Sequence, residues 1–301
     1  MNNFAAKPKL NWKTDSSSTT FAHMKISVFG MGIIGAPCAH HWQSAGHQVT
    51  RWNRTPKELD GYVADAAEAA RRSDVLSFYL KDSQALREVF SSIKPALHAG
   101  HFLMNHSTVD LDTTLWIAAE CDAIGCAFVD APFTGSKQAA HDGKLLYFLS
   151  GTTENIAKAQ EMLRPTASDG LPMGEMGRAT VFKLSTNLIA ACQIQALAEA
   201  QALCLHHGIR AEEFAAAIDC HGTTSPLTRL KLPRMLQGDY DTHFSLDNMR
   251  KDSTYALALA AQKQLDLPAM SAVSARMTEL CQQGLADQDY SALAQPYRRS
   301  E

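Results

Sequence analysis

The sequence lacks the features that mark nucleic-acid-binding, disulfide-stabilised or membrane-spanning proteins. Its 28 Lys and Arg residues are fewer than its 31 Asp and Glu residues, so the formal net charge of −3 gives no global positive field for a polyanion. No apolar run reaches the length that a bilayer-spanning segment requires. The seven cysteines are odd in number, and Cys121 and Cys126 lack the CxxC spacing of a zinc or redox site. These absences predict a cytoplasmic protein with reduced thiols.

The N-terminal segment, residues 1–23, lacks the apolar core of a signal peptide. It also contains no arginine, whereas organelle-targeting segments are usually rich in arginine. Its run of Ser and Thr at positions 16–20 has no hydrophobic periodicity. We expect a flexible tail whose role and origin are open, with Met24 opening the folded part.

At 301 residues the chain is long enough for two domains. Short apolar runs alternate with helical patterns up to about residue 150, which predicts a parallel, doubly wound sheet. The expected strands are 26–29, 48–52, 75–80, 102–105, 127–129 and 145–149, with helices such as 64–72 and 111–124 between them.

The pattern changes near Gly170, where residues 169–177 are expected to form a connector. A helical pattern of nearly thirty residues starts at Arg178 and ends near Gly208, and further helices are expected over 211–220, 247–264 and 269–284. The sequence therefore predicts a dinucleotide-binding domain over 24–176 and an all-helical domain over 177–298.

The first motif is the glycine pattern GxGxxG, which follows a predicted strand and opens a predicted helix. In a dinucleotide site Gly30 allows the tight turn, Gly32 lets the backbone approach the pyrophosphate, and Gly35 permits close packing of helix on strand. A tight turn without a ligand is the alternative. The whole predicted cofactor loop is Gly30, Met31, Gly32, Ile33, Ile34 and Gly35.

The end of the second strand bears on the choice between the two nicotinamide dinucleotides. NAD sites usually carry an acid there for the ribose 2′-hydroxyl, but this chain has Asn53, Arg54 and Thr55. A guanidinium can bind a 2′-phosphate through two charge-assisted hydrogen bonds. We therefore expect NADP(H) rather than NAD(H), although a solvated arginine in a turn would look the same.

Two further segments carry polar groups that suit a carbonyl acid. Thr134, Gly135 and Ser136 follow another predicted strand, and their hydroxyl and backbone N–H groups could hold a carboxylate. Lys183 and Asn187 are four residues apart near the start of the long helix and so share one face. A lysine among apolar neighbours can exchange a proton near neutral pH. Taken singly, these patterns also fit a common turn and a surface lysine.

Together the motifs resemble the β-hydroxyacid dehydrogenase family, which includes 3-hydroxyisobutyrate dehydrogenase and 6-phosphogluconate dehydrogenase. The matching segments span roughly residues 24–290, and the stretches around Arg54 and over 135–143 are most similar to glyoxylate/succinic semialdehyde reductases. They are the glycine loop, residues 107–110, 130–136 and 174–187, and Lys251 with Asp252. The resemblance implies an N-terminal Rossmann doubly wound parallel sheet (α/β) followed by an all-α C-terminal domain.

The resemblance also implies an activity: hydride transfer between NADP(H) and a small hydroxy acid and its aldehyde- or keto-acid partner. By the same resemblance Lys183 is the proton donor or acceptor, with Asn187 beside it. Thr108 would lie near the nicotinamide and Lys251 near cofactor and substrate. Family members are commonly homodimers or homotetramers. No nucleic-acid or membrane partner is expected.

Three residues depart from the family pattern: Phe133 adds bulk beside Thr134, Ala179 replaces a usual glycine, and His141 stands where an acid is frequent. Phe133 is expected to alter the shape of the substrate pocket. The alternatives are an imine reductase of the same architecture, which Lys183 argues against, and a non-catalytic binding protein. The adjacent histidines at 40–41 and 206–207 point about 100° apart on a helix, so no metal site is expected.

Overall fold

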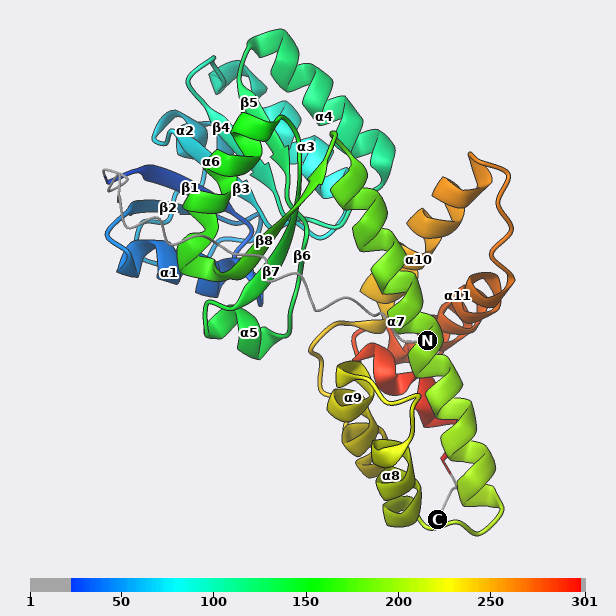
Figure 1. The fold of residues 1–301 in the computed structure, drawn as a ribbon. Coiled ribbons are helices and arrows are strands. Elements are labelled where there is room, and N and C mark those ends of the chain that lie inside the picture. The colour runs from blue at the N-terminus through cyan, green and yellow to red at the C-terminus, as the bar shows by residue number, and fades with distance from the viewer. Residues whose placement is uncertain (1–22, 299–301) are drawn as a thin grey trace, which may run out of the picture. The chain divides into compact units, whose positions relative to one another are not determined.

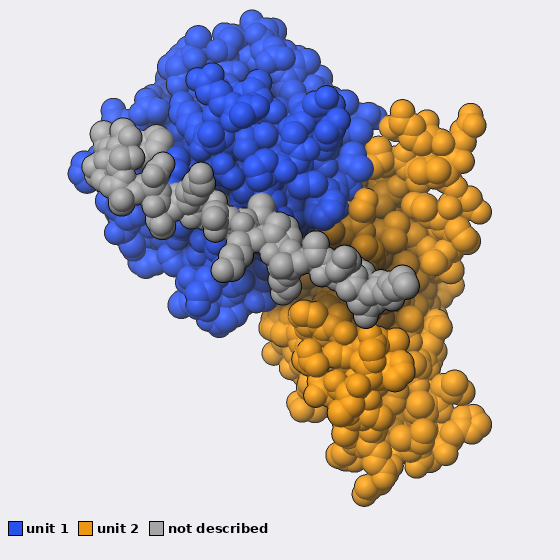
Figure 2. Space-filling model, in the orientation of Figure 1, with its two compact units in different colours: residues 1–183 blue, residues 184–301 orange. Residues whose placement is uncertain are grey.

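The computed structural model describes residues 23–298 and divides the chain into two compact units, Met1–Lys183 and Leu184–Glu301 (Figure 2). Apart from His23, the expected N-terminal tail lies outside the described residues. The boundary between the units follows Lys183, inside a long helix, whereas the sequence pattern placed it after residue 176.

The first unit contains the predicted sheet. Five parallel strands lie in the order β2-β1-β3-β4-β5, so the chain reverses its direction of winding between β1 and β3. Every residue of β3 and β4 is buried, as expected for parallel strands covered on both faces. The strands are β1 Lys25–Phe29, β2 Gln48–Trp52, β3 Val75–Phe78, β4 Phe102–Asn105 and β5 Ala127–Asp130.

Helices cover both faces of this sheet, which confirms the doubly wound prediction (Figure 1). One buried cluster includes Trp42 of α1 and Ile156 of α6, and the other includes Ala69, Phe90 and Ile117 from α2, α3 and α4. The helices are α1 Gly35–Ser44, α2 Ala66–Arg71, α3 Ser83–Ile93, α4 Leu111–Ile124, α5 Lys137–His141 and α6 Thr153–Leu163, with short 3₁₀ turns Lys94–Ala96 and Arg164–Thr166.

The far edge of the sheet differs from the prediction. Strands β6 Phe133–Thr134 and β7 Leu145–Ser150 pair antiparallel, so the sheet is parallel only in part. The expected connector 169–177 is largely a strand, β8 Ala167–Gly174, which pairs parallel with β7 and shifts register twice. Pro172 has no N–H for a second partner, and its place on a strand bonded along one side explains why a Gly- and Pro-containing segment can be a strand.

The second unit is helical, as predicted. Helix α7 spans Arg178–His206 without interruption, and Ala191, Ile194 and Ala198 contribute to the core of the unit. The other helices are α8 Ala211–Cys220, α9 Pro226–Gln237, α10 Leu246–Ala261 and α11 Pro268–Leu280, followed by a π segment Cys281–Leu285 and a 3₁₀ segment Tyr290–Tyr297.

The expectation that no apolar segment reaches spanning length needs one correction. Helix α7 has 29 residues and an 18-residue window of mean hydropathy 1.4, so by length and composition alone it could cross a membrane. Polar residues break its apolar runs, but enough Ala, Leu and Ile surround them to raise the average. A core helix of a soluble protein meets the same criterion.

Candidate active site

The glycine loop connects β1 to α1 at the point where the sheet reverses its winding, which is where open α/β sheets bind ligands. Gly30 has φ +105°, and a Cβ there would lie 2.2 Å from the carbonyl oxygen of Tyr79. A Cβ on Gly35 would lie 2.0 Å from the carbonyl oxygen of Gly30. A Cβ on Gly32 would meet nothing within 4 Å, so the space beside it is open on the protein side. These contacts agree with the roles expected of the three glycines.

The start of α1 can accept an anion. No side chain caps its N-terminus, and its first turn contains no acidic residue. The positive end of the helix dipole faces the glycine loop, where the Ala36 N–H donates to the Gly32 carbonyl over 3.2 Å. This arrangement fits the pyrophosphate of a dinucleotide.

Residues after β2 hold the peptide groups of Met31 in this loop. The Met31 N–H donates to Asn53 Oδ1 over 2.9 Å, and Lys57 Nζ donates to the Met31 carbonyl over 2.6 Å. Asn53 also donates to the Thr55 carbonyl over 2.8 Å. Sequence reasoning named Asn53 but missed Lys57, although a second cation in the segment was visible. The segment after β2 thus shapes the cofactor loop itself.

The side chain of Arg54, in the segment after β2, is exposed. Its Nη1 lies 3.8 Å from Glu88 Oε2 on α3, and the two side chains are 70% and 52% exposed. An ion pair between two exposed side chains contributes little to stability, so another anion could replace Glu88 at the guanidinium.

The loop after β4 is fixed by side-chain hydrogen bonds. Asn105 exchanges bonds with both backbone groups of Ser107, at 3.0 and 3.2 Å. Ser107 Oγ accepts from the Leu80 N–H over 2.8 Å, which ties this loop to the end of β3. Thr108, the residue expected near the nicotinamide, follows at once and is half-buried.

The predicted carboxylate-binding turn starts at Thr134, the last residue of β6. Thr134 and Gly135 are exposed, and Gly135 has φ +147°, which only glycine adopts readily. Ser136 Oγ accepts from the Ala139 N–H over 3.2 Å and so caps α5, which leaves its hydroxyl proton available to a carboxylate.

Phe133, which is expected to alter the shape of the substrate pocket, packs partly on the buried core. Its ring lies against Tyr79 and Tyr147, with centroids 6.1 Å away in each case, and it packs on the buried core. His106 stacks on the same Tyr79 at 4.5 Å. Phe133 is therefore part of an aromatic cluster with Tyr79, Tyr147 and His106, and its effect on the substrate pocket stays a prediction.

Lys183 is half-buried on α7, five residues after the helix begins. The preceding Phe182 packs edge-on against Phe148 of β7, with centroids 4.8 Å apart, and Ala179 is fully buried. Ala179 lies in α7 with ordinary helical backbone angles, so its conformation does not require a glycine. The lysine stands on a well-held turn of helix next to the sheet.

The second unit brings together Asn187, Lys251 and Asp252. Asn187 Nδ2 donates to Asp252 Oδ2 over 2.6 Å, and Lys251 Nζ lies 3.0 Å from Asp252 Oδ1. The Asp252 side chain is fully buried, while the Lys251 ammonium also lies over the ring of Tyr255 at 5.2 Å. Two predicted site residues therefore meet on a buried carboxylate that sequence reasoning mentioned only as part of a motif.

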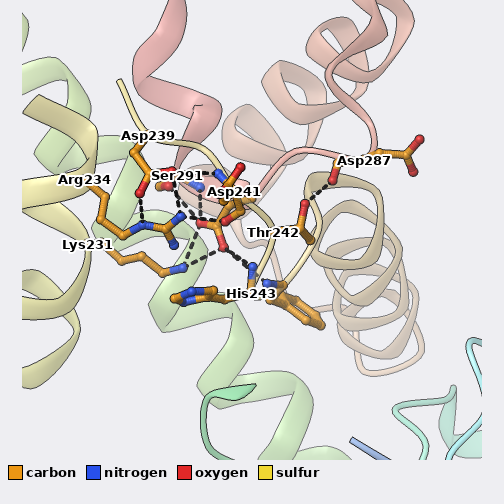
Figure 3. Close-up of polar contacts among 10 residues, drawn as sticks. Lys231, Arg234, Asp239, Asp241, Thr242, His243, Asp287 and Ser291 are labelled. Atoms are coloured by element: carbon orange, nitrogen blue, oxygen red, sulfur yellow. Dashed lines mark hydrogen bonds and ion pairs between the residues drawn. The ribbon is translucent and has the colours of Figure 1, made fainter. Parts of the chain in front are cut away.

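A second buried carboxylate organises the loop before α10 (Figure 3). Both oxygens of Asp289 accept from Lys231 Nζ, at 2.7 and 2.8 Å, and its Oδ2 also accepts from the backbone N–H groups of His243 and Phe244. Burial opposes ionisation of Asp289, but Lys231 and the bonds from Ser291 outweigh it and lower the pKa of the carboxyl. This pair fixes the chain that leads to Lys251.

No group of three or more His, Cys, Asp or Glu side chains converges as a metal site within residues 23–298.

Comparison with known proteins agrees with this architecture. Residues 25–185 match the family described as the NAD binding domain of 6-phosphogluconate dehydrogenase, and residues 177–297 match the NAD-binding family of NADP-dependent 3-hydroxyisobutyrate dehydrogenase. A solved 3-hydroxyisobutyrate dehydrogenase from Mycobacterium tuberculosis has the same fold, with a TM-score of 0.85, 22% identity, and coverage of 92% of this chain and 100% of that one.

Two curated relatives come from Arabidopsis thaliana. Glyoxylate/succinic semialdehyde reductase 2, chloroplastic, is 27% identical over 96% of this chain and 83% of its own length. Glyoxylate/succinic semialdehyde reductase 1 is 26% identical over 92% of this chain and 99% of its own length. With a dinucleotide fold, a helical unit and both family matches, the chain belongs to the β-hydroxyacid dehydrogenase family of NAD(P)-dependent oxidoreductases.

Proposed function

We propose that the protein uses NADPH to reduce a small aldehyde- or keto-acid, of the glyoxylate, succinic semialdehyde or tartronate semialdehyde type. The reductase names of the two Arabidopsis relatives support this substrate class. When bound, the reduced nicotinamide supplies the hydride. The residues of the chain hold the two reactants and move the proton.

The cofactor is held at three places in this proposal. The uncapped N-terminus of α1 binds the pyrophosphate, and the open side of Gly32 lets the phosphate oxygens approach the backbone. Arg54 binds the 2′-phosphate, which displaces Glu88 from the guanidinium. Lys57, at the Met31 carbonyl, adds a second positive charge near the same loop. An NAD-type acid at the end of β2 is replaced here by cations, which supports NADPH over NADH.

The substrate carboxylate is held by Thr134, Gly135 and Ser136. Two hydroxyl donors and the backbone N–H groups of an open turn give a small anion several hydrogen bonds without a cation. The Ser136 hydroxyl can cap α5 and donate to the carboxylate at once, because it is both acceptor and donor. The carbonyl is then oriented toward the reacting groups.

Lys183 donates its ammonium proton to the carbonyl oxygen as that oxygen gains charge, and afterwards recovers a proton from water. In the oxidation direction the neutral amine removes the proton from the hydroxyl. A lysine amine within hydrogen-bond reach of the reacting oxygen can carry out both proton transfers. Asn187, one turn along α7, orients the same oxygen, and Thr108 and Lys251 contribute contacts to cofactor and substrate.

The observation that carries the proposal is the placement of Lys183 on the first two turns of a helix that is anchored to β5 and β7, the strands that flank the carboxylate turn. The direct test mixes the protein and NADPH with glyoxylate, succinic semialdehyde, tartronate semialdehyde and a cyclic imine, and follows NADPH absorbance. Turnover of at least one carbonyl acid is expected. Turnover of the imine alone would indicate an imine reductase, and cofactor binding without turnover of any compound would indicate a binding protein; either result contradicts the proposal.

A further inference from the structure

The first turn of α7 is bound to the sheet by two side chains. Ser150 Oγ, at the end of β7, accepts from the N–H groups of Gly177 and Ala179 at 3.1 and 3.3 Å. Asp130 Oδ2, at the end of β5, accepts from the Thr180 N–H and from Thr180 Oγ1, both at 2.9 Å. Helix N-termini leave their first N–H groups without helical partners. Here two of those groups are satisfied by the two strands rather than by the helix's own N-cap.

Ser150 and Asp130 act as one unit. They pair across the antiparallel strands β5 and β7, and Ser150 Oγ donates to Asp130 Oδ2 over 3.1 Å. All three donors therefore meet on Oδ2, while Oδ1 of the same carboxylate is buried without a hydrogen-bond partner. Asp130 is fully buried, and its burial raises the pKa of the carboxyl to about 6.

A buried carboxylate is a costly way to cap a helix. The chain caps α2, α3 and α4 with Asp65, Asp82 and Asp110, none of which is fully buried. The Asp130 carboxylate gains from the helix dipole but loses hydration, so stability alone would favour the exposed arrangement. The buried position of Asp130 instead fixes the start of α7 at one place on the sheet.

We propose that Asp130 is a positioning residue for the reaction, which sets the place of Lys183 by clamping the first turn of α7 to the strand that leads to the carboxylate turn. Thr180 precedes Lys183 by three residues, and Asp130 precedes Thr134 by four. One carboxylate thus fixes both the strand that presents the substrate anion and the helix that presents the proton donor. This inference rests on the proposed function.

Thr180 allows the clamp to be altered with little change in volume. Thr180→Val removes the hydroxyl bond to Asp130 but keeps the backbone bond, and Thr180→Ser keeps both. Thr180 Oγ1 also contacts Thr114 Oγ1 over 3.0 Å, so Thr114→Val shows what the loss of that contact does by itself. Asp130→Asn and Ser150→Ala alter the other members of the network.

Thr152→Ala is the matched control for helix stability. Thr152 caps α6 by accepting from the Asn155 N–H over 3.2 Å, and α6 also follows β7. No residue of α6 belongs to the proposed site. This variant removes the ordinary N-cap of a helix outside the site and leaves α7 and Lys183 untouched.

The measurements are kcat, KM, the NADPH Kd by fluorescence, and the isotope effect with NADPH deuterated at the transferred hydrogen. Because a small misplacement of a reacting group is costly, Asp130→Asn and Thr180→Val should lower kcat roughly 10- to 100-fold. The isotope effect on kcat should rise or persist, while KM and the NADPH Kd change less than about twofold. Thr180→Ser should restore kcat, and Thr152→Ala should lower the melting temperature without changing kcat.

Equal kcat in Asp130→Asn and Thr152→Ala at matched losses of melting temperature would overturn the proposal, because Asp130 would then only stabilise the fold. A fall in NADPH affinity that parallels the fall in kcat would also overturn it. If Asp130→Asn does not fold, Thr180→Val and its Thr180→Ser rescue decide the question.

Amide hydrogen exchange separates this inference from the proposed function. Loss of the clamp should speed exchange at Ala179, Thr180 and their neighbours in α7 while leaving α6 unchanged. If the wild-type protein reduces no carbonyl acid, the proposed function fails even where this exchange result holds. Active wild-type protein with unchanged exchange and unchanged kcat in the clamp variants would reject the clamp alone.

Discussion

Asn187 donates its side-chain amide to the buried carboxylate of Asp252 over 2.6 Å, so a residue predicted to orient the substrate is itself oriented by an acid on α10. Asn187→Ala should destabilise the protein by about 1–3 kcal/mol, because a buried carboxylate loses a donor. Urea unfolding measures this loss. The same variant should also lower kcat, since the amide that would orient the carbonyl oxygen is gone.

Gln193→Ala is a matched control on the same helix. Gln193 donates to the hydroxyls of Ser225 and Thr228, which still bond to each other at 3.2 Å when the amide is removed. The loss of stability should therefore be smaller than for Asn187→Ala, and kcat should stay near wild type. An equal loss in the two variants would show that Asp252 does not depend on Asn187.

Lys183→Ala should lower kcat by about 10²- to 10⁴-fold, the range typical of a lost general acid, with the NADPH Kd nearly unchanged. Stopped-flow mixing of the enzyme–NADPH complex with substrate isolates the hydride-transfer step. Lys183→Arg retains the charge but holds its proton too tightly to exchange it, so it should be almost as slow. Near-normal turnover in either variant would remove Lys183 from the mechanism.

Arg54→Gln should weaken NADPH binding by roughly 10- to 100-fold, because one charge-assisted contact is worth about 1.5–3 kcal/mol, and should leave NADH binding almost unchanged. Calorimetric titration with both cofactors measures the two constants. Equal losses would show that Arg54 does not contact the 2′-phosphate.

Glu88→Gln should have the opposite effect. Glu88 competes with the 2′-phosphate for Arg54, but the pair is exposed and 3.8 Å apart, so the gain in NADPH affinity should be only about two- to fivefold. NADH affinity should not respond. The Arg54→Gln/Glu88→Gln double variant should show no gain over Arg54→Gln, because the competition requires the guanidinium.

His106 predicts a pH dependence of stability. It is fully buried, bonded to Ser77 and to the Ala131 carbonyl, and burial lowers its pKa to about 4 despite the carbonyl. Since the unfolded state takes up its proton near pH 6.5, the stabilising contribution of neutral His106 is present above that pH and is lost as the pH falls toward 4. The loss amounts to about 3 kcal/mol.

Asp130 acts in the same pH window with the opposite sign. Its folded pKa of about 6 lies above the unfolded value, so its contribution is greatest below pH 4 and is lost as the pH rises through 6. The two effects should nearly cancel in the wild type. Urea unfolding of His106→Gln should therefore show stability rising toward acid pH, and that of Asp130→Asn should show it falling. Parallel curves for all three proteins would contradict both assignments.

The main elements of the fold could be predicted because their signals are local. The bounds of β2, β4, α4 and α8 follow from apolar periodicity and from caps such as Asp110. Helix α9 was not among the predicted helices, and it contains Pro226 and Pro233. Pro226 begins the helix, where its missing N–H costs nothing, but Pro233 is accommodated inside it. Strand β8 depends on its pairing with β7, which no local pattern reveals.

For the candidate site, the sequence suggested the residues of the motifs but not the partners that hold them. Motif spacing predicted the glycine loop, and the family resemblance implied the carboxylate turn and Lys183; the roles of these residues stay predictions. The partners that hold them come from distant segments: Asp130 is 50 residues from Thr180, and Asp252 is 65 from Asn187. Such pairs form only when the tertiary structure brings their elements together, so the sequence alone could not assign them.

The ion pair of Lys231 and Asp289 also sets an order of assembly. Lys231 is synthesised 58 residues before Asp289 and would be left as an unpaired cation in an apolar core if the helices closed first. During synthesis, the core of the second unit can close around Lys231 with its charge paired only after Asp289 has been added.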